Sequence, residues 1–204
     1  MQRNPIPLVA EALGFTAAMA VYIWFVRAQW PWSLLVLAAL VLASFTWHSE
    51  TLKSLGLTGG AFVDAMVAWR WWLATGMAAV AILGWMRAVP AHLVYRWLVY
   101  LSWCILQQLL FQNMVYRRLR AALGSSWTTS LCAGALFAAT HLPNPILVPA
   151  TLLWGTVSTR MFDSRSSIPA LGLWQALLST LLSTLTPIAL IRQFRVGPGY
   201  WTWM

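Results

Sequence analysis

Apolar residues fill most of the chain in long runs, and short basic or Pro- and Gly-rich segments separate these runs. A helix needs about 20 consecutive, mostly apolar residues to cross the hydrocarbon core of a bilayer. Helices are the favoured spanning structures because a helix satisfies its own backbone hydrogen bonds within lipid. The pattern predicts about seven spans, at residues 8–27, 32–47, 66–86, 93–114, 127–141, 145–162 and 168–191.

The composition agrees with this pattern. Hydrophobic residues make up 60% of the chain, the mean hydropathy is +0.70, and only 8% of the residues are charged. A soluble domain carries about 25% charged residues. We therefore expect an all-α fold, a polytopic transmembrane helical bundle, as a single integral membrane domain over residues 1–204. The first run lacks a clear cleavage site for a signal peptidase, so we expect it to remain as a membrane helix.

The net charge of +9 follows the predicted topology. With a cytoplasmic N-terminus, one group of basic residues falls inside: Arg3, Lys53, Arg117, Arg118, Arg120, Arg160 and Arg165. A smaller group falls outside: Arg27, Arg87, Arg96, Arg192 and Arg195. The bias favours the cytoplasmic N-terminus under the positive-inside rule. Contact with anionic lipid headgroups accounts for such clusters, so the charge does not indicate nucleic acid.

Five polar residues fall at predicted bilayer depth, where polar groups are expensive and usually functional. They are Gln107, Gln108, Gln112, His141 and Gln175, and they come from three different predicted spans. Gln108 and Gln112 are four residues apart and would share one face of an α-helix. Packing of these helices in a bundle would bring all five side chains to one interior cavity.

The order of these residues resembles the CAAX-protease and bacteriocin-processing (CPBP) family of intramembrane proteases. Members carry Glu-Glu-x-x-x-Arg, then Phe-x-x-x-His. In this chain Phe137 and His141 match the second motif, and Pro-Asn-Pro follows shortly afterwards, as in many bacterial members. Gln107, Gln108 and Gln112 occupy the places of the two glutamates and the arginine.

A third family motif, His-x-x-x-Asn or His-x-x-x-Asp, lies on a later helix. Gln175 and Ser179 occupy its two places here. The resemblance covers about residues 95–190 and implies a CAAX-protease-like core within the helical bundle. In the family, the first glutamate is thought to activate water for peptide hydrolysis, while the histidines position that water or stabilise an oxyanion.

The departures from the family motifs bear on function. A general base must accept a proton at working pH, and a glutamine amide has no titratable group. Loss of the glutamates together with the arginine leaves no unpaired charge, whereas removing one partner alone leaves an uncompensated buried charge. We therefore expect a non-catalytic member, a pseudoenzyme that acts as a structural or assembly subunit of a larger membrane complex. The expected setting is a bacterial inner membrane, with other membrane protein subunits as partners.

Two alternatives stay open. In the first, the protein is an active intramembrane endopeptidase in which Glu11 or Asp163 supplies the base. The preferred interpretation of Glu11 is a solvated carboxylate near a helix N-terminus, where the helix dipole favours it. In the second, His141 is the axial ligand of a haem or chlorophyll, and the protein is a pigment- or quinone-associated subunit.

Neither a metal nor a cofactor is expected from the polar cluster. Zinc generally takes three or four His, Cys or carboxylate ligands, and the cluster contains His141 alone. His48 and His92 fall near span boundaries and are expected at the membrane interface. The favoured interpretation of His141 is an interior histidine whose hydrogen bonds are satisfied within the protein.

Overall fold

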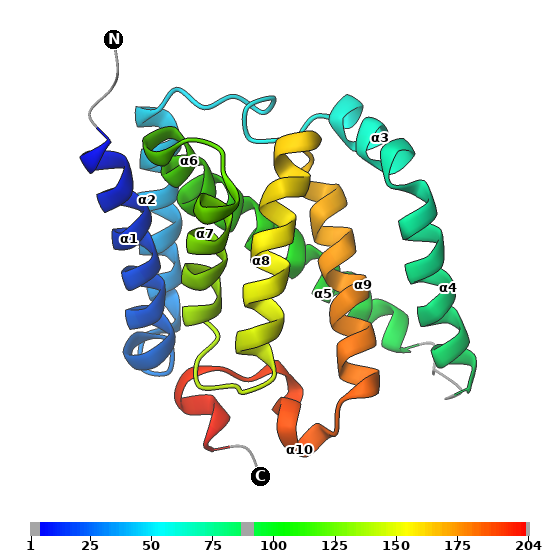
Figure 1. Ribbon diagram of the computed structural model, residues 1–204. Helices are drawn as coiled ribbons and strands as arrows, with labels where there is room; N and C mark the ends of the chain where they lie inside the picture. Colours follow the sequence, from blue (N-terminus) through cyan, green and yellow to red (C-terminus); the bar gives the residue numbers. More distant parts are fainter. Residues whose placement is uncertain (1–4, 87–91, 203–204) are drawn as a thin grey trace. The chain divides into compact units, whose positions relative to one another are not determined.

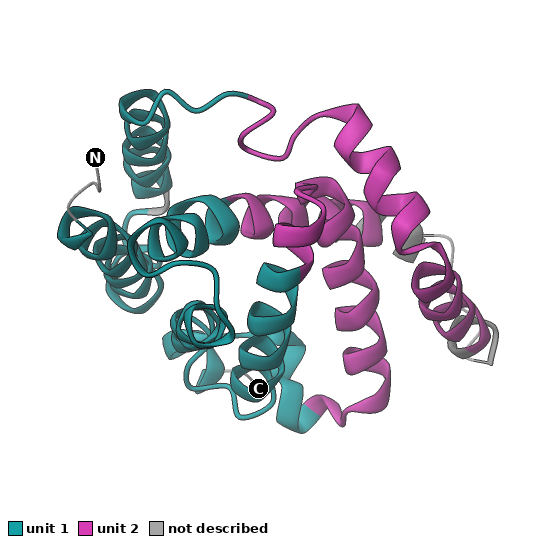
Figure 2. Cartoon of the chain, turned by 45° about the horizontal axis from the view of Figure 1, so that its top comes forward, with its two compact units in different colours: residues 1–51, 110–160, 189–204 teal, residues 52–109, 161–188 magenta. Residues whose placement is uncertain are grey.

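The chain is predominantly helical over the residues that the computed structural model describes, 5–86 and 92–202 (Figure 1). Helices account for 80% of the structure, and these residues form no strand. This confirms the all-α prediction. The Cα positions group into two compact units, coloured in Figure 2, and each unit combines segments that are far apart in the sequence.

Unit 1 contains residues 1–51, 110–160 and 189–204. Its longer helices are α1 (Ile6–Val21), α2 (Leu34–Trp47), α6 (Arg117–Leu123), α7 (Trp127–Ala139) and most of α8 (Leu147–Ser164). Its short helical segments are η1 (Tyr22–Val26), η2 (Pro31–Ser33), η3 (Phe111–Tyr116), α10 (Ile188–Ile191), η4 (Arg192–Phe194) and η5 (Gly197–Tyr200).

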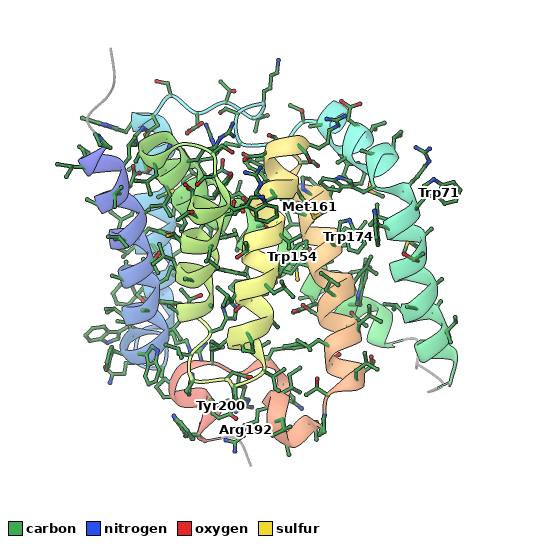
Figure 3. The ribbon with its side chains drawn as sticks, in the orientation of Figure 1. Trp71, Trp154, Met161, Trp174, Arg192 and Tyr200 are labelled. Carbon is green, nitrogen blue, oxygen red and sulfur yellow. The ribbon has the colours of Figure 1, made fainter. Side chains whose placement is uncertain are left out.

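Unit 2 contains residues 52–109 and 161–188. Its helices are α3 (Gly59–Ala68), α4 (Arg70–Met86), α5 (His92–Leu110) and α9 (Ile168–Leu185). Trp174 of α9 lies towards α4, as Figure 3 shows. Its ring lies 3.5 Å from the position that a Cβ on Gly76 would take, an ordinary van der Waals distance, so α9 packs against α4 at this point.

Two glycines let α7 and α8 approach closely in unit 1. A Cβ added to Gly134 would lie 2.8 Å from the carbonyl oxygen of Leu152, and one added to Gly155 would lie 2.9 Å from the Cα of Gly134. Small residues at helix contacts are typical of membrane bundles, where close backbone packing replaces the hydrophobic drive available in water.

Side chains cap the helices that follow turns. Ser126 accepts a hydrogen bond from the Thr129 backbone nitrogen at 3.0 Å, which starts α7. Asn144 Oδ1 accepts hydrogen bonds from Ile146 N at 3.1 Å and Leu147 N at 3.0 Å, which starts α8. Such caps satisfy backbone donors that have no partner in the first turn of a helix.

The same Asn144 ties the C-terminal segment to unit 1. Its Nδ2 donates to the carbonyl oxygens of Ile191 at 2.9 Å and Arg195 at 3.1 Å, and Asn144 is fully buried. Figure 3 shows Arg192 and Tyr200 together at this end, where the guanidinium lies 4.3 Å from the ring centroid. The aromatic, turn-rich tail is therefore packed against its own unit.

The number of long apolar helices is smaller than the number of spans expected. Within residues 5–86 and 92–202, three helices have the length and hydropathy to cross a bilayer, or up to four if a pair bent by 79° counts as one span. The three are Ile6–Val26, Trp97–Leu123 and Ile168–Leu185, and the bent pair is Gly59–Ala68 with Arg70–Ile82. The structure therefore does not confirm seven spans.

The physical reason lies in helix length and polarity. The expected spans 32–47 and 127–141 form α2, with 14 residues, and α7, with 13 residues. At 1.5 Å per residue, both fall short of the ~30 Å hydrocarbon core. The expected span 145–162 forms α8, which has 18 residues but includes Arg160 and Asp163 near its C-terminal end.

The outward-facing side chains of both units suit a lipid environment. Large apolar side chains are exposed on many helices, including Trp47 at 86%, Trp71 at 74% and Trp72 at 72%. Trp71 projects away from α4 in Figure 3. Exposed apolar surface on this scale is unusual for a soluble monomer. Together with the long apolar helices, it identifies an integral membrane protein.

Candidate functional site

Three of the predicted site residues form a hydrogen-bonded chain in unit 2. Gln108 Nε2 donates to Gln175 Oε1 at 2.6 Å, and Gln175 Nε2 donates to Gln107 Oε1 at 2.7 Å. Gln108 is fully buried and Gln175 is 7% exposed. The amide of Gln175 thus uses both its acceptor and its donor to join the two glutamines of α5 to α9.

A glycine sets the distance between these two helices. A Cβ added to Gly172 of α9 would lie 2.8 Å from the Cα of Ile105 on α5, closer than real Cβ contacts allow. Gly172 is three residues before Gln175, and Ile105 is three residues before Gln108, so the close approach lies about one helical turn from the amides. This contact places α5 and α9 within hydrogen-bonding range of each other at the glutamines.

Ser179 also lies in unit 2, one turn beyond Gln175. Its side chain shares a hydrogen bond with the hydroxyl of Tyr100, which also contacts Cys104. The residue at the family's Asn or Asp position therefore joins α9 to α5 by a second polar contact. Tyr100 and Cys104 of α5 take part in this polar contact with α9. No sequence motif indicated Tyr100.

Gln112 lies in unit 1, in the π-helical turn η3 that follows α5. All six residues of η3 are buried, and Gln112 is fully buried. Its Nε2 donates to Ser158 Oγ of α8 at 3.2 Å. Gln108 lies in α5 and Gln112 in the π-helical turn that follows it, so their expected shared helix face stays a prediction.

His141 follows α7 in a turn of unit 1 and is 8% exposed. Its Nδ1 lies 2.8 Å from the carbonyl oxygen of Phe137 and 3.2 Å from Thr140 Oγ1. A carbonyl only accepts hydrogen bonds, so Nδ1 carries the hydrogen and Nε2 has the free lone pair when the ring is neutral. The expectation of an interior histidine with protein partners is met at Nδ1.

Aromatic rings hold this histidine in place. The ring of Phe137 meets the imidazole edge-on, with centroids 4.8 Å apart, and stacks on Phe111 with centroids 4.6 Å apart. Phe111 belongs to η3 and Phe137 to α7, so the family's Phe-x-x-x-His spacing positions a packed ring and a histidine one helical turn apart.

The two units thus contain different parts of the predicted set. Unit 2 brings together Gln107, Gln108 and Gln175, with Ser179 nearby. Unit 1 holds the remaining family positions, Gln112, Phe137 and His141. The expectation that all of them line one cavity stays a prediction.

A buried ion-pair cluster in unit 1 was missed by the sequence analysis. Glu50 lies between two guanidiniums, 2.8 Å from Arg117 Nη1 and 3.1 Å from Arg118 Nη1, and its side chain is 5% exposed. Arg117 also donates to Asn113 Oδ1 at 2.9 Å. The only indication of this cluster in the sequence was the run of basic residues after a predicted span. We expected that run to form a cytoplasmic surface.

The same cluster contains Glu11. Its Oε2 lies 2.8 Å from His48 Nε2 and 3.2 Å from Arg118 Nε, and its Oε1 accepts a hydrogen bond from the Ser44 hydroxyl. The side chain is 24% exposed. The interpretation of Glu11 as a solvated carboxylate is therefore wrong, because three partners from α2 and α6 surround it.

Among the residues that the structure describes, no three His, Cys, Asp or Glu side chains come together as a metal-ligand set. The side chain of His92 lies outside the part that the structure describes. The described polar groups form hydrogen bonds and ion pairs, and His141 Nε2 carries a lone pair when the ring is neutral.

The long apolar helices and the exposed apolar side chains define an integral membrane protein. Residues 89–181 match the family model described as type II CAAX prenyl endopeptidase Rce1-like. This match covers a little under half of the chain, confirms the resemblance to the CPBP family and includes every predicted site position. No curated protein and no solved structure matches the chain significantly.

Proposed function

We propose that this protein is a non-catalytic CAAX-protease-like membrane protein that serves as a structural or assembly subunit of a larger membrane complex. The observation that carries the proposal is the amide chain from Gln108 through Gln175 to Gln107. These residues occupy the positions of both family glutamates and one histidine. Uncharged amides there join two helices, a structural role that needs no proton transfer.

Chemistry supports the same conclusion. Water activation by a general base needs a group that takes up a proton near working pH. None of Gln107, Gln108 and Gln175 has such a group. His141 could accept a proton at Nε2, but a lone imidazole lacks the neighbouring carboxylate that the family pattern supplies. We therefore assign the retained phenylalanine and histidine to packing.

A cleavage assay tests the non-catalytic part of the proposal. The purified full chain in liposomes is incubated with a prenylated C-terminal peptide, the substrate class that the family description names. We expect no cleavage above the rate of empty liposomes. Sequence-specific cleavage that Gln107→Ala or His141→Ala abolishes would overturn the proposal, provided that Gln29→Ala, a change at an exposed glutamine outside the site, leaves it intact.

A restoration experiment separates a lost base from an unsuitable substrate. The variant carries Gln107→Glu, Gln108→Glu, Gln112→Arg and Gln175→His together. General acid–base groups contribute about 10²–10⁴-fold to rate, so a gain of this size would identify the amides as the reason for inactivity. Gln107→Glu alone is the matched control and should stay inactive, since its new carboxylate gains no arginine.

Co-purification tests the subunit role. The protein is extracted gently from its native membrane, which we propose is a bacterial inner membrane with the N-terminus on the cytoplasmic side. Mass spectrometry should find a stoichiometric protein partner, and the absorption spectrum should show no pigment. A protein recovered alone would contradict the subunit role, and a coloured protein would favour the pigment-associated alternative through His141.

One observation favours a second candidate function. Glu11 Oε2 and His48 Nε2 lie 2.8 Å apart, and a carboxylate–histidine pair can serve as a general base. An active endopeptidase built on this pair would lose its cleavage activity in Glu11→Gln and keep it in Asp64→Asn. Activity that survives Glu11→Gln excludes Glu11 as the base.

A further inference from the structure

A pocket of about 370 Å³ lies between α1 and α2 in unit 1, outside the residues that match the family model. Its apolar wall is formed by Pro7, Leu8, Ala43 and Trp47. Its polar wall is formed by Glu11, Ser44 and His48. The volume is at the low end of the range of about 300–1,000 Å³ for small-molecule sites, which suits a single hydrocarbon chain with a small head.

The helix that forms one wall has little packing of its own. Val41 is the buried residue of α2, and Ala43 and Trp47 are exposed. Three residues connect the polar end of α2 to α1 and α6: Ser44 and His48 bond to Glu11, and Glu50 bonds to Arg118. The polar contacts hold the helix end in place while the apolar wall beside them stays open to a ligand.

The polar wall offers a hydrogen-bond acceptor to the pocket. An ionised carboxylate only accepts hydrogen bonds, so the contact between His48 and Glu11 requires the hydrogen on His48 Nε2. In the neutral imidazole, Nδ1 then keeps a free lone pair. His48 has 17% of its side chain exposed, and its other ring nitrogen is fixed by Glu11. Nδ1 is therefore the ring nitrogen of this lining residue that can accept a hydrogen bond from a ligand.

The charges behind this wall are balanced. Glu11 and Glu50 contribute two negative charges, and Arg117 and Arg118 contribute two positive charges. Glu11 is already paired with Arg118 and His48, so a charged head would lose its hydration without gaining an unpaired opposite charge. A neutral hydroxyl avoids this penalty and can donate to His48.

The position of the pocket indicates where the ligand comes from. Pro7 lies in the first turn of α1 and His48 is the C-cap of α2, so the pocket lies where both apolar helices end. Both ends lie at the top of Figure 1. The indole of Trp47 is 86% exposed there, as expected for a residue at the membrane interface. A bilayer amphiphile reaches this depth with its chain in lipid and its head at the surface.

We propose that this pocket binds a neutral bilayer amphiphile with a single chain, whose hydroxyl head donates a hydrogen bond to His48 and whose chain lies against Leu8, Ala43 and Trp47. The site is independent of the proposed non-catalytic role, because the residues that form it precede the family segment. The proposed ligand therefore binds α1 and α2, the two N-terminal helices.

Photocrosslinking of the full chain in liposomes tests the proposal. Three probes share one diazirine-bearing alkyl chain and differ in the head: a hydroxyl, a primary ammonium or a carboxylate. All three probes are compared at the same mildly alkaline pH. Peptide mapping should place the hydroxyl probe on α1 and α2 at least about tenfold above the other two, a preference equivalent to about 1.4 kcal/mol.

Two variants make the test specific. Ala43→Trp fills the pocket without touching the ion pairs and should reduce hydroxyl-probe labelling of α1 and α2 about tenfold. Leu42→Trp adds the same side chain at a neighbouring exposed position outside the pocket lining and should leave labelling unchanged. His48→Leu should remove the preference for the hydroxyl head while leaving chain-dependent labelling.

Two results would overturn the proposal. Equal labelling by all three heads would mean that the helices contact ordinary surrounding lipid. Labelling that persists in Ala43→Trp would mean that the chain lies elsewhere. Because the head series uses the unmodified protein, the result does not depend on whether a variant folds.

Discussion

Two polar regions of this protein differ in the charge of their side chains. In unit 1, Glu50 is almost fully buried and meets two arginines, so that region keeps its charges and pairs them. In unit 2, Gln107, Gln108 and Gln175 are joined by hydrogen bonds and carry no charge at all. Both regions connect helices, one through ion pairs and the other through amides.

The comparison bears on why the family glutamates are absent. A general intolerance of buried charge does not explain their replacement, because the same chain keeps a buried carboxylate at Glu50. A buried charge is stable when an opposite charge accompanies it. The family arginine position holds Gln112, so a carboxylate at Gln107 or Gln108 would lose the partner that the family pattern supplies. The neutral amides are consistent with that change.

The largest effect is expected from breaking the ion-pair cluster. Glu50→Gln removes the carboxylate that Arg117 and Arg118 share, and the guanidinium of Arg118 is itself buried. Removal of one partner of a buried ion pair typically costs about 3–5 kcal/mol, so the free energy of unfolding should fall by that amount. The measurement is a denaturing-detergent titration in mixed micelles.

The matched control for this variant is Asp64→Asn, which makes the same chemical change at an exposed carboxylate on α3. Its unfolding free energy should stay within about 0.5 kcal/mol of the unmodified protein. If Glu50→Gln is as mild as the control, the ion pairs contribute nothing to stability and the contrast between the two regions is lost.

An intermediate effect is expected from separating α5 and α9. In Gly172→Ala, the new Cβ would lie 2.5 Å from Ile105 Cγ1 and 2.8 Å from its Cα, so the backbone must shift. Overpacking of this kind costs about 1–3 kcal/mol. Gly76→Ala is the control in the same unit, because its Cβ meets Trp174 at an ordinary 3.5 Å. A stable Gly172→Ala and a destabilised Gly76→Ala would contradict this packing.

The smallest effect is expected from the amide chain itself. Gln175→Leu removes the partner of both glutamines on α5, and hydrogen bonds between membrane helices average about 0.6 kcal/mol each. We expect a loss of about 1 kcal/mol in the same titration. The triple variant with leucine at all three positions should regain most of it, because no buried amide is then left without a partner.

A loss in Gln175→Leu as large as that in Glu50→Gln would show that neutral and charged contacts are equally strong in this protein. A triple variant that is worse than Gln175→Leu alone would show that the glutamines have further essential contacts. Either result would change the comparison between the two regions.

The sequence predicted much of the site and less of its surroundings. Phe137 and His141 could be recognised from their spacing, and the glutamines from their polarity within apolar runs. The ion-pair cluster could not be predicted, since Glu11, Ser44 and Arg118 lie far apart in the chain and no motif links them. Gly172 gave no signal either, because the importance of a glycine depends on which backbone approaches it.

Hydropathy, helical periodicity and the family motifs by themselves determined an all-helical membrane protein with amides at the CAAX-protease positions. These properties depend on side-chain chemistry and local spacing, and neither depends on how the helices pack. The tertiary structure alone decided which helices are long enough to span, that Glu11 is ion-paired, and that Gln175 joins Gln107 and Gln108. Those outcomes depend on distances between segments remote in sequence, and only the packed chain sets such distances.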